Sequence, residues 1–283
     1  MHKTNVRQAN LRQPEPDNYT KQEVFMDISI LQAENLKQYP SLRHCFTTRL
    51  GGTSREPRFS SLNLGVKTED ARSCIVSNFD AVRKRMGFTD IVLANQEHTD
   101  TVRVVSRADA GRGLTRPLFP EGVDALVTNT SNLALGIVYA DCVPVLLYDP
   151  VKSAIGAVHS GWRGTVAQIA VKAAQTLCRT YGSRPETIVA AIGPSIRQCH
   201  FETGLEVARE FEAAYGGFFA EIAQIRGEKA YIDMQSAVAH DLREYGLRDI
   251  IDLELCTVCR NDTFFSHRCG DGGRMCALIE MMG

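Results

Sequence analysis

Three residues that can bind a metal lie where the sequence predicts the ends of buried strands. They are His98, Cys142 and His159, and each follows or ends a short apolar run. A strand end holds a side chain rigidly, as a metal ligand or a nucleophile requires. Two histidines and one cysteine leave a fourth position open, which is the ligand count of catalytic zinc sites. Because spacings of 44 and 17 residues match no local zinc motif, a Cys142 packed in the core as a small apolar side chain stays an alternative.

The turn that follows His159 favours a binding site for an anion. Residues 160–165 read SGWRGT, with two glycines around the only tryptophan of the chain. The turn is expected to lead into a helix from Val166, and a helix N-terminus attracts anions. Arg163 adds a planar guanidinium that suits phosphate or carboxylate. Thr165 as a plain N-cap and Trp162 as a core residue are the simpler interpretations.

A second group of possible metal ligands lies near the C-terminus. It comprises Cys256, Cys259, His267, Cys269 and Cys276. Cys256 and Cys259 form a CxxC pair, for which a structural zinc knuckle is physically reasonable. Only one such pair is present and the other members are irregularly spaced, so the pattern leaves a second metal open.

The elements that would position these residues alternate between strands and helices. Short apolar and β-branched runs predict strands at 133–139, 145–148, 154–159, 188–192 and 253–258. Apolar residues at helical spacing predict helices at 70–86, 166–177, 205–215 and 234–245. Gly182 is a suitable stop for the second of these helices. This mixture predicts an α/β or α+β layered fold, with residues 21–283 as a single catalytic domain.

The composition is that of an ordinary globular protein. Of 283 residues, 44% are hydrophobic and 23% charged, and the net charge of -1 gives no concentrated basic face for nucleic acid. The polar segment 1–20 predicts a flexible tail and lacks the apolar run of a signal peptide. No stretch is long enough for a membrane helix. We therefore expect a cytoplasmic protein in which the nine cysteines are thiols or metal ligands.

A series of ordered motifs carries a resemblance to a known family. The motifs are TTRLGGTS at 47–54, SLNLG at 61–65, NQEHTD at 95–100, DALVTN at 124–129, ADCVPVLLYD at 140–149, GAVHSGWRGT at 156–165, IGPSI at 192–196 and an FFS…GGR pattern that ends at 274. They span about Phe46 to Glu280, nearly all of the folded part. The chain resembles the peptidoglycan editing factor family, also known as laccase-like polyphenol oxidases and purine nucleoside phosphorylases.

The resemblance implies a fold, a metal site and an activity. The family fold is a layered α/β/β/α arrangement of mixed sheets flanked by helices, and its metal triad corresponds to His98, Cys142 and His159. Members cleave adenosine, inosine and methylthioadenosine with phosphate to the base and ribose 1-phosphate, and they deaminate adenosine. The editing name reflects another proposed role, the removal of L-serine from a muramyl precursor.

The chain departs from the family pattern at four places. Thr99-Asp100 follows the first histidine, Cys199-His200-Phe201 replaces a Cys pair and Tyr, His267 stands where Tyr is common, and Cys269 is unexpected. None of these changes removes a member of the triad. Because these segments are expected to line the substrate pocket or its rim, the substrate preference of the family does not transfer directly to this chain.

A phosphorylase mechanism assigns roles to several further residues. Zinc on the triad would act as a Lewis acid on phosphate or water. Arg163, Arg49 and Asn63 are expected to bind phosphate or substrate. Asp141 is expected either to orient a ligand histidine or to carry a proton, with a structural hydrogen-bonding role as the alternative. We expect purine nucleosides and phosphate as ligands, no nucleic-acid or membrane partner, and a monomer or homodimer.

Three other functions compete with this one. A copper-dependent polyphenol oxidase (laccase) is compatible with a Cys and two His, but multicopper chemistry needs more histidines than the seven present. A metal-free hydrolase would use Cys142 as nucleophile and His159 as base. An amidase acting on a muramyl precursor would use the same zinc.

Overall fold

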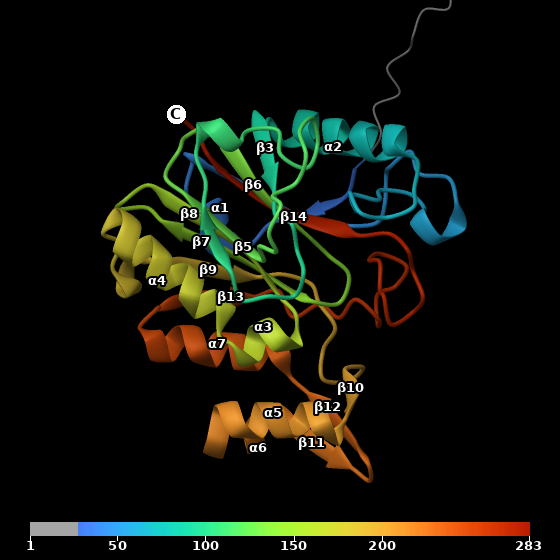
Figure 1. The fold of residues 1–283 in the computed structure, drawn as a ribbon, viewed down its shortest axis with the longest axis vertical. Coiled ribbons are helices and arrows are strands. Elements are labelled where there is room, and N and C mark those ends of the chain that lie inside the picture. Colours follow the sequence, from blue (N-terminus) through green and yellow to red (C-terminus); the bar gives the residue numbers. More distant parts are fainter. Residues whose placement is uncertain (1–27) are drawn as a thin grey trace, which may run out of the picture.

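The computed structural model describes residues 28–283, so the predicted tail at 1–20 lies outside the described residues. Two large mixed sheets lie at its centre (Figure 1). The five-stranded sheet has the order β1-β2-β14-β6-β3. Its strands are β1 (Ile30–Leu31), β2 (Leu42–Thr47), β14 (Met275–Met281), β6 (Leu133–Tyr139) and β3 (Asp90–Leu93).

The six-stranded sheet has the order β13-β9-β7-β8-β5-β4. Its strands are β13 (Asp249–Asp252), β9 (Val189–Ile192), β7 (Val143–Asp149), β8 (Ala154–Ser160), β5 (Ala125–Thr128) and β4 (Val102–Val104). A smaller sheet consists of β10 (Glu202–Gly204), β12 (Lys229–Ile232) and β11 (Ala223–Arg226). The helices are α1 (Glu34–Lys37), α2 (Arg72–Met86), α3 (Trp162–Val166), α4 (Ile169–Tyr181), α5 (Leu205–Tyr215), α6 (Phe219–Ile222) and α7 (Met234–Tyr245).

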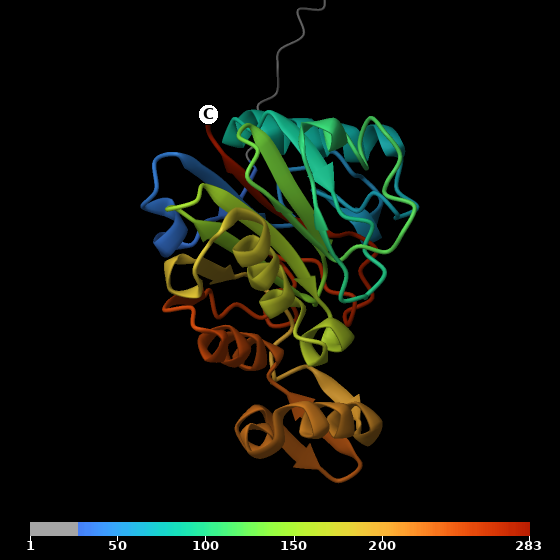
Figure 2. The same cartoon turned by 60° about the vertical axis from the view of Figure 1, so that its left-hand side comes forward.

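Side-chain alternation along the strands builds the layers. In β6, Leu135 and Ile137 face the core between the two large sheets, whereas Ala134 faces the core beneath α2. In β7, Leu146 faces the inter-sheet core and Val145 faces the core formed with α4 and α7. Helices therefore cover the outer face of each sheet, which confirms the predicted α/β/β/α arrangement (Figures 1 and 2).

A small unit protrudes from one end of the layers. It contains the three-stranded sheet with α5 and α6, and both ribbon views show it below α7 (Figures 1 and 2). Its apolar residues, including Phe211 and Ile232, belong to the same core cluster as α4 and α7. None of the helices within residues 28–283 is long and apolar enough to cross a membrane.

Two of the predicted elements are wrong. The helix expected at 166–177 is two helices, because Gln168 adopts a left-handed conformation (φ 56°) between α3 and α4. The longer of them ends at Gly182, as predicted. Residues 253–258 form no strand, and the edge strand is instead β13, which pairs in parallel with β9.

Candidate metal and substrate site

Strand pairing brings the three predicted metal ligands together. Cys142 lies directly before β7 and His159 near the end of β8, where it pairs with Pro144 of the neighbouring strand. His98 lies in the loop that follows β3. One ligand atom from each of the three residues lies within 4.8 Å of the other two, and Cys142 Sγ is 3.9 Å from His98 Nε2. The structure thus places the triad in one cluster, as a shared metal site requires.

Asp124, which directly precedes β5, organises this cluster. Its Oδ1 accepts a hydrogen bond from His159 Nδ1 at 2.8 Å, which leaves Nε2 of this histidine free for a ligand. The same carboxylate accepts the backbone N–H groups of Glu97, His98 and Thr99 and the Thr99 hydroxyl. Asp124 is fully buried. A carboxylate behind a ligand histidine fixes the orientation of the ring and increases its basicity.

The backbone around the ligands is conformationally constrained. His98 adopts a left-handed conformation with φ 59°, which is uncommon for a residue other than glycine. A Cβ at Gly161 would lie 2.9 Å from His98 Cδ2 and 3.3 Å from Cys142 Sγ. Glycine is therefore required here, because any side chain would push into the space where the two ligands meet. Such strain persists where the surrounding structure stabilises it, as at functional sites.

Electrostatics favour an ionised cysteine beside a protonated histidine in the metal-free protein. Burial disfavours the Cys142 thiolate, but the charges and hydrogen bonds of His159 and His98 outweigh burial and lower the pKa of the thiol to about 6. Burial also disfavours the imidazolium of His159, yet the Cys142 thiolate and Asp124 raise its pKa to about 9. A thiolate is the form in which cysteine binds metal, and His159 would release its proton when a cation binds.

We expect the alkylation rate of Cys142 in metal-free protein to rise with a midpoint near pH 6. The thiolate is the reacting form, so lowering its pKa moves the rise in rate to lower pH. In His159→Ala the stabilising cation is gone, and the midpoint should move up toward that of an ordinary thiol. Iodoacetamide labelling at a series of pH values, read by mass spectrometry of the Cys142 peptide, measures both midpoints. Identical midpoints in the two proteins would contradict the charge coupling.

Of the two roles expected for Asp141, its hydrogen bonds match the structural one. Its Oδ1 accepts a hydrogen bond from the Thr257 hydroxyl, and its Oδ2 accepts hydrogen bonds from the Ser266 hydroxyl and the backbone N–H of Arg268. The carboxylate that orients a ligand histidine is therefore Asp124 and not Asp141. Because both oxygens of Asp141 already accept hydrogen bonds within the protein, the structure favours the structural role over proton transfer. Through these hydrogen bonds, Asp141 connects the segment 257–268 to the turn that contains Cys142.

Two cavities meet at the metal ligands. The first, of about 350 Å³, is called the Lys67 cavity, and its lining includes Val66, Lys67, Gln96, Val138, Tyr139 and Arg274. The second, of about 470 Å³, is called the Trp162 cavity, and its lining includes Trp162, Arg163, Ile196, Phe201, Met234 and Arg268. Both cavities share His98, Ala140, Cys142 and His267. Each is of a size suited to a small-molecule ligand.

Arg163 is one of the predicted phosphate-binding residues, and its side chain lines the Trp162 cavity. It is exposed in the Trp162 cavity and stacks on the Trp162 ring, with its guanidinium carbon 4.3 Å from the ring centroid. It forms no ion pair with an acidic residue of the described chain, so its charge is free for a ligand. The N-cap of α3 is Gly161, not Thr165, and this helix of five residues is too short to provide an anion site of its own.

Arg49 and Asn63 lie in neither cavity. The Arg49 guanidinium is paired with Asp271, donates to two backbone carbonyls and covers the Phe265 ring. Its predicted role in phosphate binding therefore has no structural support, because its charge is already neutralised. Asn63 is fully buried, and its Oδ1 accepts hydrogen bonds from the backbone N–H groups of Gly65 and Arg274. It positions two segments that line the Lys67 cavity instead of contacting a ligand there.

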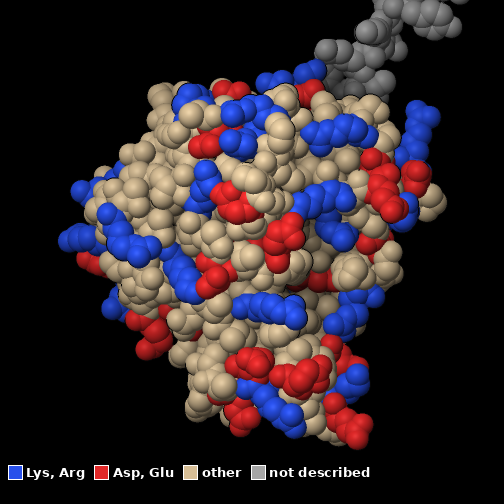
Figure 3. Space-filling view, in the orientation of Figure 1, with Lys and Arg blue, Asp and Glu red and all other residues tan. Residues whose placement is uncertain are grey.

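Sequence reasoning missed Asp124, Lys67 and Arg274. Asp124 opens the DALVTN motif and Arg274 closes the GGR motif, so their motifs signalled them without indicating a role. Lys67 follows SLNLG and has an ion pair with Glu97, next to the ligand His98. On the face shown in Figure 3, basic and acidic side chains are interspersed.

The structure brings together only two of the five predicted C-terminal residues. Cys256 and Cys259 lie together, and their partners are Cys199 and His200. His267 lines both cavities instead, and Cys276 is buried in β14. The predicted C-terminal grouping is therefore wrong, although its CxxC pair does lie in a cluster of possible ligands.

Together, the four layers and the His₂Cys set define a layered α/β protein with a candidate metal site between two cavities. Residues 43–282 match the model of the family described as multi-copper polyphenol oxidoreductase laccase, and the chain belongs to this family. This agrees with the resemblance seen in the motifs.

Relatives within the family carry enzyme names. The chain is 35% identical over 246 residues to purine nucleoside phosphorylase YlmD of Bacillus subtilis, covering 83% of this chain and 87% of that protein. It is 32% identical over 236 residues to adenosine deaminase RL5 from an unknown prokaryotic organism, covering 79% and 87%. The crystal structure of the hypothetical protein YfiH of Bacillus licheniformis superposes with a TM-score of 0.83 at 33% identity, covering 89% of this chain and 96% of that one.

Proposed function

We propose that this protein is a zinc-dependent purine nucleoside phosphorylase that also deaminates adenosine. Its substrates would be adenosine, inosine and methylthioadenosine, which phosphate cleaves to the free base and ribose 1-phosphate. The observation that carries the proposal is the convergence of His98, Cys142 and His159 at the junction of two cavities. One of these cavities contains Arg163, which has no acidic partner among residues 28–283. The names of the phosphorylase and deaminase relatives support both activities.

The donor set fits zinc. Two imidazole nitrogens and one thiolate converge, Gly161 leaves the space beside them clear, and a carboxylate backs one histidine. His98, Cys142 and His159 would hold the ion and leave one position open, as in catalytic zinc sites. When bound, the ion would supply a Lewis acid where the two cavities join.

The two cavities suit different parts of the substrates. In the Trp162 cavity, Arg163 would bind phosphate through its planar guanidinium, and the Trp162 ring beneath it holds that guanidinium in place. In the Lys67 cavity, the partly buried Val66 and Val138 offer apolar surface to a purine base. The ribose would then lie at the junction, beside Cys142 and His98, where the glycosidic bond is broken.

Chromatography of adenosine and inosine after incubation with zinc-loaded protein tests the proposal directly. Release of adenine and hypoxanthine is expected only with phosphate, and conversion of adenosine to inosine is expected without it. Both reactions should disappear in Cys142→Ala. If zinc-loaded protein turned over neither nucleoside, the proposal would be wrong, and hydrolysis of muramyl-serine amides would be the next reaction to assay.

Arg163→Ala is expected to raise the KM for phosphate about 10- to 100-fold, because a charge-assisted hydrogen bond contributes about 1.5 to 3 kcal/mol. The deamination of adenosine needs no phosphate and should change much less. Arg209→Ala on the exposed surface of α5 is a matched control and should leave both reactions unchanged. Steady-state kinetics at varied phosphate concentration measure the KM for phosphate of both variants. An unchanged KM in Arg163→Ala would show that Arg163 does not bind phosphate.

The family description supports one further candidate, a copper-dependent oxidation of phenols. A cysteine with two histidines also suits copper, so the ligand set alone does not choose between the metals. Turnover of nucleosides and of a phenol should be compared in protein loaded with zinc and in protein loaded with copper. Nucleoside turnover that follows zinc and not copper supports the proposal, whereas phenol oxidation in copper-loaded protein alone supports the rival.

A further inference from the structure

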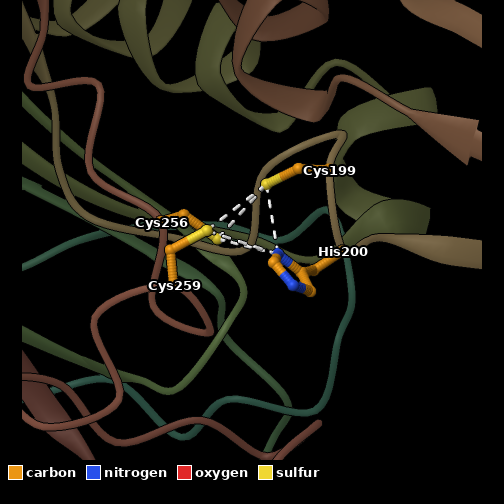
Figure 4. Close-up of side chains that lie close together, drawn as sticks. All are labelled: Cys199, His200, Cys256 and Cys259. Carbon is orange, nitrogen blue, oxygen red and sulfur yellow. Dashed lines mark hydrogen bonds between the residues drawn. The ribbon is translucent and has the colours of Figure 1, made fainter.

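A second cluster of metal-binding side chains lies apart from the triad and shares no residue with it. Cys199 and His200 come from the loop between β9 and β10, and Cys256 and Cys259 from the loop between β13 and β14. Figure 4 shows the three sulfur atoms and one ring nitrogen pointing toward a common centre. The four ligand atoms all lie within 4.8 Å of one another.

We propose that this Cys₃His cluster is a structural zinc site. Cys199 Sγ is 3.7 Å from Cys256 Sγ and 3.7 Å from Cys259 Sγ. His200 Nδ1 is 3.1, 3.8 and 3.4 Å from the sulfurs of Cys199, Cys256 and Cys259. Tetrahedral zinc with Zn–S bonds of about 2.3 Å and a Zn–N bond of about 2.0 Å separates sulfurs by about 3.8 Å and sulfur from nitrogen by about 3.5 Å. The side chains already have nearly the spacing that the ion needs.

The arrangement of the three cysteines favours a metal site over a disulfide. Cys199, Cys256 and Cys259 are all free thiols, and Cys199 Sγ is 3.7 Å from both other sulfurs, whereas a disulfide would hold one pair of sulfurs at about 2.0 Å. A disulfide would also give no reason for the His200 ring nitrogen to face all three sulfurs. Four protein ligands with no open position are the set of a structural zinc, in contrast to the three-residue set of the triad.

The site would stabilise the wall of the Trp162 cavity. Phe201, directly after the ligand His200, lines this cavity. Thr257, between the two ligands of the CxxC pair, donates its hydroxyl to Asp141, which lines the same cavity. The ion would thus join two loops that are 57 residues apart between Cys199 and Cys256. It would also fix the chain where the protruding unit begins at β10 (Figure 1).

Zinc content per chain, measured by plasma mass spectrometry on protein produced with zinc, tests the proposal. Wild-type protein should contain two zinc ions, Cys142→Ala one, Cys259→Ser one and the double variant none. Cys269→Ser is the matched control, because Cys269 is an exposed thiol of the neighbouring loop outside the cluster. It should retain two ions and the wild-type melting temperature, whereas Cys259→Ser should melt several degrees lower.

Cys142→Ala keeps the test decisive even if Cys259→Ser fails to fold, and even if the proposed phosphorylase activity is wrong. Its remaining zinc should show three sulfur ligands and one nitrogen ligand by X-ray absorption. All nine thiols of the wild-type protein should react after denaturation with a chelator. A Cys142→Ala protein without zinc, a zinc with fewer sulfur ligands, or only seven reactive thiols would overturn the assignment.

Discussion

Replacing Cys142 by alanine is expected to abolish nucleoside cleavage and to remove the metal of the triad. Cys142 is the only sulfur ligand of this set and lines both cavities. Without the thiolate, two histidines remain, and they hold zinc far more weakly because the anionic ligand is gone. Loss of a Lewis acid worth several kcal/mol predicts a decrease in turnover of about 10³-fold or more.

Metal content and turnover should be measured on the same Cys142→Ala preparation, with Cys74→Ala as the control. Cys74 is a half-buried thiol of α2 outside both metal clusters, so its variant should keep the metal and the activity. Turnover by wild-type protein whose triad holds no metal, if it were lost in Cys142→Ala, would favour the metal-free rival in which Cys142 is the nucleophile. A Cys142→Ala protein with wild-type turnover would falsify any catalytic role for the triad.

Elements with strong local signals could be predicted to the residue. The structure places α5 and α7 at the predicted residues 205–215 and 234–245, and β6 at 133–139. Both helices carry apolar residues at helical spacing and end at a glycine, Gly216 or Gly246. Periodicity and a C-terminal glycine act within the element itself, so they can be read without knowing the rest of the fold.

The misplaced elements depend on contacts that are distant in the sequence. Residues 253–258 are as apolar as a strand, but Cys256 and Thr257 turn to the Cys₃His cluster and to Asp141. The true edge strand β13 reads DIID and is only half buried, so its signal is weak. The break at Gln168 has no breaker residue, and no feature of the local sequence predicts it.

The residues of the site also divide into those that the local sequence predicts and those that depend on contacts distant in the sequence. The triad could be predicted because ligand residue types stood at strand ends and inside family motifs. Its supporting carboxylate could not, since Asp124 and His159 are 35 positions apart and meet only through the pairing of β5 with β8. The CxxC pair was visible, but its partners Cys199 and His200 become neighbours only when β9 and β13 lie side by side.

Asp124→Asn is the second substitution with a large expected effect. The asparagine keeps the shape but loses the charge, and its amide group must face some of the N–H groups that the carboxylate now accepts. Loss of a carboxylate behind a metal ligand lowers metal affinity about 10- to 100-fold. Unpaired buried donors lower the free energy of unfolding by about 2 to 4 kcal/mol. Chelator competition and denaturant unfolding measure the two effects.

The free energy of unfolding at low pH provides an independent test of the Asp124 carboxylate. Burial opposes its ionisation, but His159 and the backbone N–H groups outweigh burial and lower the pKa of Asp124 to about 2. A carboxyl whose pKa is lower in the folded state stabilises the protein above its unfolded pKa of about 3.9. That contribution is lost as the pH falls toward 2, so Asp124→Asn should lose less stability than wild-type protein over this range.

Asp149→Asn separates the role of Asp124 in the site from the general cost of altering a buried aspartate. Asp149 is also fully buried, but it lies at the far end of β7 and accepts the N–H of Val151. Its variant should be less stable yet bind the triad metal normally. If Asp124→Asn weakened metal binding no more than Asp149→Asn does, the hydrogen bond to His159 would serve the fold alone, and the orientation of the metal ligand would have to come from strand pairing.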